Sequence, residues 1–543
     1  MNIFKSMWII LALCAAMLMS CGETQSQQQW TPEILSDTQV YLPDFSFAGY
    51  HWGEKSLPDH AATINIADFG AIPDDGLDDS DAILKAVAAA HEQPGVAVVK
   101  FPAGKFILSK MLYIDRSNLV LQGSGSGNNG TTIYLPIPMK DMPLAEGLAE
   151  LNEYLVRYDK RVKSGELFSP FSWTGGIIWT RMPGKRIYPY LEENDQPTPI
   201  ITRISDGKRG EHNFTAAPTE TLQSGDLVKL LWFNPLGETS SLLTHMYGEG
   251  DFRIGERHWE NPDRELIQQL VTITSIDGNT IRIKEPLLHD VRAEWNCAIA
   301  PAEVQTEIGI EHLRIEFPET EYGGHHLEHG YNAIYLTSTA HSWIRDVHFV
   351  NTDNAILSDD CANVTITDIK FSGRRTHYTT HVGKVNHFLV KNMTVDCPTE
   401  HSISFNTFSK GSVYTDVDIL QTPSLDQHCG TNHQNLFDNI RISANENPLD
   451  LFMHGGAGYW KPTHGKFNTF WNIQLTFADN IAQDSVVIKP IKDGPFARFV
   501  GFSANRPVKL EYGPNAYFEG VNRAGIAVPS LYEFQLSKRL QSE

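Results

Sequence analysis

The chain has 543 residues and a formal net charge of −21, from 44 basic and 65 acidic side chains. A protein that binds nucleic acid needs a basic surface, so this charge argues against nucleic acid as a partner, although a local basic cleft for an acidic ligand remains compatible with it. The length exceeds the usual size of one compact domain unless the fold is elongated.

Residues 1–21 predict a lipoprotein signal peptide. The apolar run at 8–19 is too short to span a bilayer, which takes about 20 residues. It ends in Leu18-Met19-Ser20-Cys21, which resembles a bacterial lipobox and implies cleavage before Cys21 and acylation of that residue. We therefore expect a lipid anchor at Cys21 and a location at a bacterial membrane, with the outer membrane favoured. An ordinary secretion signal with a chance cysteine is the alternative.

Four cysteines remain after Cys21, namely Cys297, Cys361, Cys397 and Cys429. No two of them are spaced as in a zinc ribbon or a redox pair, and four in so long a chain do not form a disulfide scaffold. We expect them to be buried thiols.

The first folded segment predicts a helix followed by short strands. Asp79 is the expected N-cap of the helix, with Ile83, Val87 and Ala90 on one face. Apolar strands separated by glycine turns follow at 96–101 and 119–125.

Several short motifs in this segment occur together in a fixed order. They are Asp68-Phe69-Gly70-Ala71, Asp78-Asp79, Phe101-Pro102-Ala103-Gly104 and Leu121-Gln122-Gly123-Ser124-Gly125. Together they resemble the opening of the pectate-lyase-like superfamily of right-handed parallel β-helices. The resemblance covers residues 64–135 firmly and the later coils more loosely. It implies the fold and an action on carbohydrate, as a polysaccharide lyase or a glycoside hydrolase, and no particular substrate.

Six strand-like phrases in the second half repeat at a regular spacing. Each has an Asn or Asp just before its last apolar residue, and these last residues are Val347, Ile369, Met393, Val417, Ile440 and Ile473. Their separations of 22, 24, 24, 23 and 33 residues indicate a solenoid, because one coil buries its apolar face only against its neighbours. The longest separation requires a loop of roughly ten residues near 455–466.

The segment that lies between the first coils and the repeat has a different sequence pattern. An amphipathic helix is expected at Leu148, Leu151 and Leu155, and Asp277-Gly278-Asn279 is typical of a hairpin turn between two strands. The charged and aromatic loop at 236–266 is either a lid over the groove, which we favour, or a solvated excursion.

The predicted fold class is all-β, a right-handed parallel β-helix solenoid with an N-terminal capping helix and an inserted β-rich module. The expected divisions are 22–60 for a tether and N-terminal extension, 61–140 for the cap and first coils, 141–305 for the inserted module, 306–525 for the main β-helix with a catalytic groove, and 526–543 for a C-terminal tail.

Histidines gather in the repeat, where fourteen of the 21 lie between His312 and His464. Residues at the same distance before the last apolar residue of each phrase are expected to stack in a column along the solenoid. Two such columns are predicted. One holds Asp353, His377, His401 and Ser424, and the other holds Leu357, His381, Phe405 and His428. Ile403 and Phe405 have the same parity as His401, so the alternative is that this face points inward.

The histidines with their neighbouring cations suggest β-elimination on a uronate-containing polysaccharide. That reaction needs a base for the proton at C5, positive charge on the carboxylate and an acid for the leaving oxygen. The predicted catalytic residues are His377, His381, Arg375, His401, Lys384, Asp426 and His428. The predicted substrate-binding residues are Arg374, Asp353, His454 and Trp460. The alternative is that these are inert polar residues on one strand face.

Two other functions stay open. Hydrolysis by paired carboxylates is one, since Asn351-Thr352-Asp353 and Asp359-Asp360 are similar to acidic motifs of polygalacturonase-like hydrolases. In that family the motifs lie on successive coils and are followed by Gly-His-Gly and Arg-x-Lys, which this sequence lacks. Non-catalytic binding of a surface glycan is the other.

A metal is not expected. His325-His326-Leu327-Glu328-His329 contains the spacing of the inverted zinc proteases, but that motif needs a helix, and flanking glycines favour a loop here. No cofactor is predicted, although calcium held by carboxylates is an alternative. The candidate carboxylates are Asp353, Asp359, Asp360 and Asp426.

Tryptophans in expected loops or insertions are candidate platforms for sugar rings. These are Trp173, Trp179, Trp232, Trp259 and Trp460, whereas Trp343 and Trp471 are expected to pack in the coils.

Overall fold

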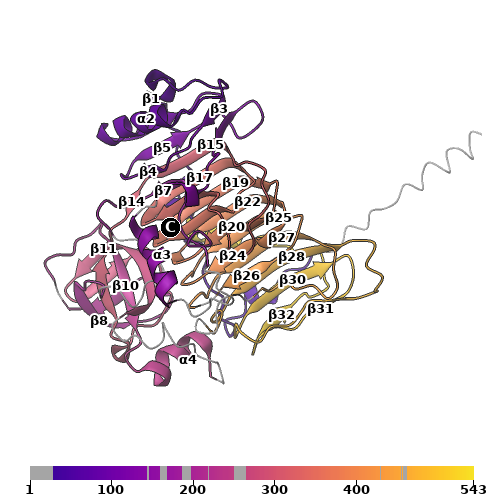
Figure 1. Ribbon diagram of the computed structural model, residues 1–543. Helices are drawn as coiled ribbons and strands as arrows, with labels where there is room; N and C mark the ends of the chain where they lie inside the picture. The colour runs from indigo at the N-terminus through magenta and orange to yellow at the C-terminus, as the bar shows by residue number, and fades with distance from the viewer. Residues whose placement is uncertain are drawn as a thin grey trace, which may run out of the picture.

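The computed structural model describes residues 29–143, 146–158, 168–185, 197–217, 219–249, 264–428, 430–453, 455 and 461–542. Two long sheets of parallel strands run side by side through it as a solenoid (Figure 1). This arrangement confirms the predicted parallel β-helix.

The first of these, the large sheet, has sixteen strands. They are β1 (Ile64–Asn65), β2 (Ala97–Lys100), β3 (Gly104–Ile107), β5 (Leu119–Gln122), β6 (Thr131–Tyr134), β14 (Gln305–Thr306), β15 (Ile308–Glu316), β17 (Thr339–Val350), β19 (Cys361–Ser372), β21 (Val385–Asn386), β22 (Leu389–Asp396), β25 (Val413–Ile419), β27 (Leu436–Ala444), β28 (Thr469–Phe477), β30 (Arg498–Ala504) and β32 (Tyr517–Glu519).

The second, the small sheet, has eight strands. They are β4 (Leu112–Ile114), β7 (Ile178–Thr180), β16 (Asn332–Thr337), β18 (Asn354–Asp359), β20 (Thr376–Val382), β23 (Thr399–His401), β24 (Ile403–Asn406) and β26 (Leu425–His428). A short pair, β29 (Val486–Val487) and β31 (Val508–Lys509), lies outside both sheets.

The register of the large sheet follows the predicted repeat. Val347 pairs with Ile369, and the ladder continues through Met393, Val417, Ile440 and Ile473. The polar residue before each position has a φ between 49° and 57°, a left-handed conformation that Asn and Asp tolerate better than most residues. The recurrent Asn or Asp therefore marks the same backbone bend in every coil.

Helix α2 (Ser80–Glu92) lies at the N-terminal end of the solenoid (Figure 1). Its buried face includes Ile83, Val87 and Ala90, as predicted, together with Ala86, and it packs into the core of the first coils. Asp79 precedes the helix at its N-cap position, although its side chain accepts hydrogen bonds from the backbone amides of Ile72 and Ile107 instead of capping the helix.

Both ends of the described chain pack on the outer face of the large sheet. Trp30 and Phe45 share a hydrophobic cluster with Trp471 and with Leu531 of helix α5 (Leu531–Ser542). The carboxylate of Asp438 accepts from the backbone amide of Leu531 at the start of α5. The short 3-10 turns η1 (Glu33–Leu35) and η2 (Tyr50–Gly53) belong to the N-terminal extension, and η3 (Ile66–Phe69) follows β1.

A closed antiparallel barrel interrupts the solenoid and lies beside it (Figure 1). Its strands are β8 (Thr202–Gly207), β9 (Asn213–Ala216), β10 (Leu227–Phe233), β11 (Glu265–Asp277), β12 (Thr280–Ile283) and β13 (Ala298–Pro301). Asp277 pairs with Thr280, so the predicted hairpin is present. Lys229 Nζ on β10 lies 2.5 Å from Asp360 Oδ1, and this partly buried ion pair joins the barrel to the solenoid.

Two expectations for the insertion need correction. Strand β7 pairs with β4 and β16, so residues 178–180 belong to a solenoid coil and not to the module expected at 141–305. Helix α4 (Ser241–Tyr247), in the loop expected as a lid, packs its leucines into the barrel core, because its apolar face matches that core. Residues 250–263 of that loop lie outside the described residues.

The remaining helices are short. α3 (Glu146–Tyr158) is the amphipathic helix predicted there, with Leu148, Leu151 and Leu155 buried. The other turns are η4 (Met139–Asp141), η5 (Gly237–Thr239) and η6 (Ala293–Trp295). Within the described ranges no helix is both long and apolar enough to cross a membrane. Cys297, Cys361 and Cys397 are buried free thiols, as expected.

Candidate active site

The small sheet carries the predicted histidines, but in a different register from the one expected. His401 pairs with Tyr378, one residue away from the expected partner His377. His381 pairs with Ser404, not with Phe405. Leu357 pairs with His381 as expected. The next coil-to-coil step is 23 residues where the large sheet has 24, so the expected columns are wrong by one residue from that step onward.

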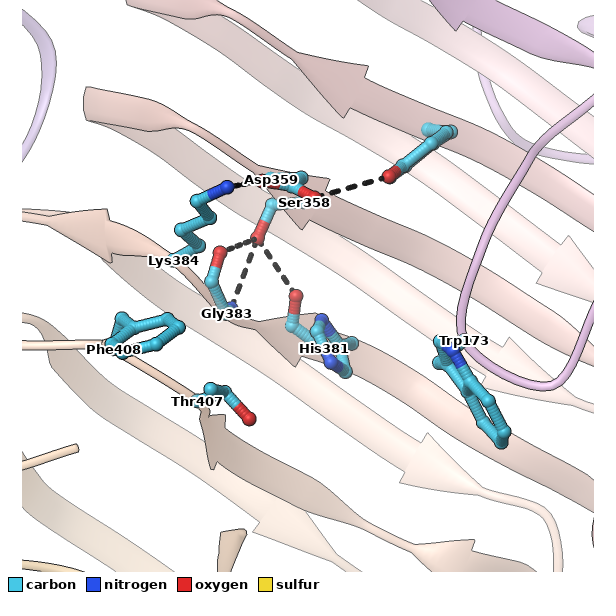
Figure 2. A pocket seen from close by; sticks show the side chains of 9 residues that line it. Trp173, Ser358, Asp359, His381, Gly383, Lys384, Thr407 and Phe408 are labelled. Atoms are coloured by element: carbon cyan, nitrogen blue, oxygen red, sulfur yellow. Dashed lines mark hydrogen bonds and ion pairs between the residues drawn. The ribbon is translucent and has the colours of Figure 1, made fainter. Parts of the chain in front are cut away.

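A pocket opens on this sheet around His381 (Figure 2). It encloses about 290 Å³, part of it open solvent. Its lining residues are Trp173, Tyr335, Ser358, Asp359, His381, Gly383, Lys384, Thr407 and Phe408. The ring of His381 lies so close to residue 383 that only glycine fits there, since a Cβ would lie 2.3 Å from Cε1 of His381.

The pocket combines a cation, a carboxyl group and an imidazole. Lys384 Nζ lies 3.4 Å from Asp359 Oδ1 (Figure 2). The Tyr335 hydroxyl lies 3.5 Å from Asp359 Oδ2. Burial raises the pKa of Asp359. Burial alone would lower the pKa of Lys384, but Asp359 and Asp360 outweigh it and raise that pKa. Lys384 is therefore the positive charge of this pocket.

The imidazole of His381 is available for proton transfer. Burial lowers its pKa to about 3, so the ring is neutral in the free protein at neutral pH. Both of its ring nitrogens are buried without an aligned hydrogen bond to a described residue, and the side chain of Asn406 is a polar group that interacts with the ring. Such a group in a pocket is typical of a functional site.

Next to the pocket, a histidine cluster is formed by His325, His326, His377, His401 and His428. The rings of His377 and His401 lie 5.2 Å apart, and that of His325 lies 4.8 Å from His377. Tyr378 stands between cluster and pocket, with its ring 4.5 Å from that of His401 and 5.1 Å from that of His381.

Two buried carboxylates approach the cluster. Glu328 Oε1 lies 2.9 Å from His377 Nδ1, and Asp426 Oδ2 lies 3.1 Å from His401 Nδ1 and 3.2 Å from His428 Nδ1. Burial acts to raise the pKa of both carboxyl groups, but the histidines and hydroxyl donors outweigh it and lower both. Both carboxylates are therefore ionised, and burial keeps the pKa of His377 below its usual value in spite of Glu328.

Arg374, Arg375 and Asp353 are engaged with other protein groups. Arg374 Nη2 donates to Asp353 Oδ1 at 2.7 Å, and the other oxygen of Asp353 accepts from the amides of Gly330 and Tyr331. Arg375 donates to the carboxylate of Glu400 at 2.9 Å. None of the three lines the pocket around His381, so their predicted contact with substrate has no support from the pocket geometry.

The other expected residues fall into two groups. Cys21, His454, Trp259, Trp460 and Cys429 lie outside the described residues. Of the other tryptophans, Trp173 lines the pocket, whereas Trp179 and Trp232 are 1% and 0% exposed and pack inside the protein. The expectation of sugar platforms at Trp179 and Trp232 is therefore wrong, and Trp343 and Trp471 are buried as predicted.

Tyr335, Tyr378 and Glu328 were not among the predicted site residues. Tyr335 falls on an apolar strand, where a tyrosine is expected to belong to the core, and Tyr378 has the same parity as Val382 on a strand of threonines and histidines. Glu328 lies in the His325–His329 string, whose loop conformation is as expected. That string was the sequence signal that could have pointed to Glu328. Its contact is with His377, about fifty residues later in the chain, and a local pattern does not predict such a contact.

The four carboxylates considered for calcium do not converge. Asp360 contacts Lys185 and Lys229, Asp359 contacts Lys384, and Asp353 contacts Arg374. Asp426 accepts from the Ser404 hydroxyl beside its histidines. Each carboxylate thus has its own cation or donor.

Comparison with known proteins agrees with this architecture. Residues 63–136 match the family model described as rhamnogalacturonase A/epimerase, pectate lyase-like. No curated protein sequence matches the chain.

Solved structures similar to the chain include a phage tailspike and a bacterial enzyme. The tailspike protein gp49 from Pseudomonas phage LKA1 is 11% identical, with 84% of this chain and 78% of that chain covered and a TM-score of 0.42. DFA-IIIase from Arthrobacter chlorophenolicus A6 without its lid is 13% identical, with 84% and 94% covered and a TM-score of 0.38. The family match over the first coils confirms the resemblance of this chain to pectate-lyase-like β-helix proteins.

Proposed function

We propose that this protein is a polysaccharide lyase that cleaves a uronate-containing glycan by β-elimination in the pocket around His381. The observation that carries the proposal is that a neutral imidazole, one lysine and one carboxyl group line the same solvent-open pocket. These three groups match the base, the positive charge and the acid that the reaction needs.

Each group has a role in this mechanism. Lys384 pairs with the uronate carboxylate, which makes the C5 proton acidic. His381 removes that proton, a double bond forms between C4 and C5, and the bond from C4 to the bridging oxygen breaks. Asp359 donates its own proton to the leaving oxygen, and the proton on His381 is released to solvent before the next turnover. A bound carboxylate beside His381 would raise the low pKa of the free imidazole and so strengthen the base.

Hydrolysis is the second candidate, because burial raises the pKa of Asp359 as a general acid requires. An inverting hydrolase also needs a second carboxylate about 6.5–9.5 Å away. Asp359 is the sole carboxylate among the described residues that line the pocket, which favours elimination.

The proposed setting is outside the cytoplasm, on a bacterial membrane, through a lipid at Cys21. This part rests on the sequence of residues 1–21 alone. Labelling of the expressed chain with a fatty-acid analogue, compared with a Cys21→Ala variant, would test it. Label that persists in the variant would contradict the anchor.

The test of the reaction is the ultraviolet absorbance of the unsaturated uronate product. The purified chain would be incubated with a panel of uronate-containing polysaccharides, and reducing ends would be measured in parallel. Absorbance that rises together with reducing ends is the expected result. New reducing ends without absorbance would identify a hydrolase, and binding without either product would identify a glycan-binding protein.

A further inference from the structure

The histidine cluster has a geometry that the proposed elimination does not use. One ligand nitrogen from each of His325, His377 and His401 can be chosen so that all three lie within 4.8 Å of one another. His377 and His401 are each 1% exposed, and His325 is exposed. Three imidazoles therefore converge on one point, with an open side at His325.

One ring nitrogen of each buried histidine has no partner. Nε2 of His377 and Nε2 of His401 make no hydrogen bond to any described residue, whereas Nδ1 of each ring lies beside a carboxylate. A buried polar atom that makes no hydrogen bond is unfavourable, and such an atom calls for an explanation such as an ion. Coordination of a metal ion would satisfy one nitrogen on each ring.

The carboxylates lie where the second nitrogen of each ring needs them. Glu328 Oε1 and Asp426 Oδ2 lie 2.9 and 3.1 Å from Nδ1 of His377 and His401, so a small rotation of each ring would let Nδ1–H donate to its carboxylate. Histidines that ligate a metal usually donate their other N–H to a carboxylate or carbonyl, which fixes the tautomer. Nε2 of both rings is then left to face the ion.

We propose that His325, His377 and His401 bind one divalent transition-metal ion of the zinc class. Three imidazoles are a ligand set that suits zinc, cobalt and nickel better than calcium or magnesium, which prefer oxygen. Three protein ligands leave one coordination position for water or substrate. The inverted zinc-protease spacing is not the basis of this site, because its second histidine, His329, is not one of the three converging ligands.

The test measures metal binding in the absence of any polysaccharide, so it does not depend on the proposed function. The full-length protein would be stripped with a chelator, titrated with Co²⁺ while its visible absorption is recorded, and titrated with Zn²⁺ by calorimetry. We expect one ion per chain and the absorption bands of nitrogen-ligated Co²⁺. His401→Gln and His377→Gln should each weaken Zn²⁺ binding by at least 100-fold.

His341→Gln is the matched control, because His341 is also buried with an unpartnered ring nitrogen but lies on the large sheet. It should bind Zn²⁺ like the wild type. The wild type should also gain thermal stability with Zn²⁺, and His401→Gln should not.

Wild-type protein that binds Co²⁺ or Zn²⁺ no more tightly than His401→Gln would overturn the proposal, as would an equal loss in His341→Gln. A protein that binds the metal but yields no unsaturated product would refute only the proposed elimination. One that releases the product but binds no metal would refute only the metal site.

Discussion

The two long sheets of the solenoid are built from the same coils but differ in regularity. In the large sheet the ladder from Val347 to Ile473 keeps one alignment through six coils, and polar side chains at the bends bond to one another, as Asn392 does to Asp368 and Asn472 to Asn439. In the small sheet the strand opposite β20 is divided into β23 and β24, and His377 and His401 bury Nε2 without a hydrogen bond.

The difference separates scaffold from site. Stacked coils are stable when polar groups have partners and each apolar residue meets its neighbour, and the ladder of the large sheet from Val347 to Ile473 follows this rule. Buried polar atoms without partners destabilise a fold, and in native proteins they concentrate where chemistry or binding needs them. The small sheet is therefore the place to look for activity.

The largest expected effect is on the small sheet. His381→Ala should lower the rate of unsaturated product formation by about 10²–10⁴-fold, because the base is lost. His348→Ala is the control, since His348 lies on the large sheet and contacts Arg314 and Ser372. Kinetics of both variants on the same substrate check this. Equal rates in the two variants would remove His381 from the mechanism.

A core substitution in the large sheet should act on stability instead. Phe437 is fully buried between Phe470, 5.2 Å away, and Tyr414, 6.1 Å away. Phe437→Ala should lower the free energy of unfolding by about 3–5 kcal/mol, because it leaves a cavity in the stack. Urea denaturation measures this. A loss below about 1 kcal/mol would show that the coils collapse around the gap.

Lys410 lies in the chain between β24 of the small sheet and β25 of the large sheet, and its burial makes stability depend on pH. It is 1% exposed, and burial lowers its pKa to about 7. In the unfolded chain the pKa of a lysine is about 10.4, so between about pH 7 and pH 10 the unfolded state binds a proton that the folded state does not. The free energy of unfolding of the wild type is therefore expected to fall as the pH drops from about 10 to about 7, by at most about 5 kcal/mol. Lys410→Met should remove this term, and its advantage in melting temperature should be largest near pH 7 and small near pH 10. Parallel curves for the two proteins would contradict the prediction.

The smallest effect concerns the bends of the large sheet. Asn439 has a φ of 50° and donates to Asp416. Asn439→Ala and Asn439→Gly remove the same hydrogen bonds, but alanine is strained at this φ and glycine is not. Asn439→Gly should therefore be the more stable of the two by about 1–2 kcal/mol in urea denaturation. If the alanine variant is as stable, the left-handed bend does not explain the recurrent Asn or Asp.

The sequence by itself determined the solenoid and the large sheet. Local apolar spacing and the recurrent Asn or Asp predicted the ladder through Val417 and Ile440, because both features repeat with every coil and each coil obeys the same packing rule. The helix after Asp79 and the hairpin at Asp277 were equally predictable, since the apolar periodicity of a helix and the residues of a turn are local features.

Only the tertiary structure decided the site. The register of the small sheet depends on how many residues each bend takes up, and one residue moved His401 from the expected partner His377 to Tyr378. The contact of Glu328 with His377, the burial of Trp179 and the pairing of Arg374 with Asp353 arise between segments far apart in the chain. Such contacts follow from the global packing of coils, loop and barrel, which local sequence patterns do not encode.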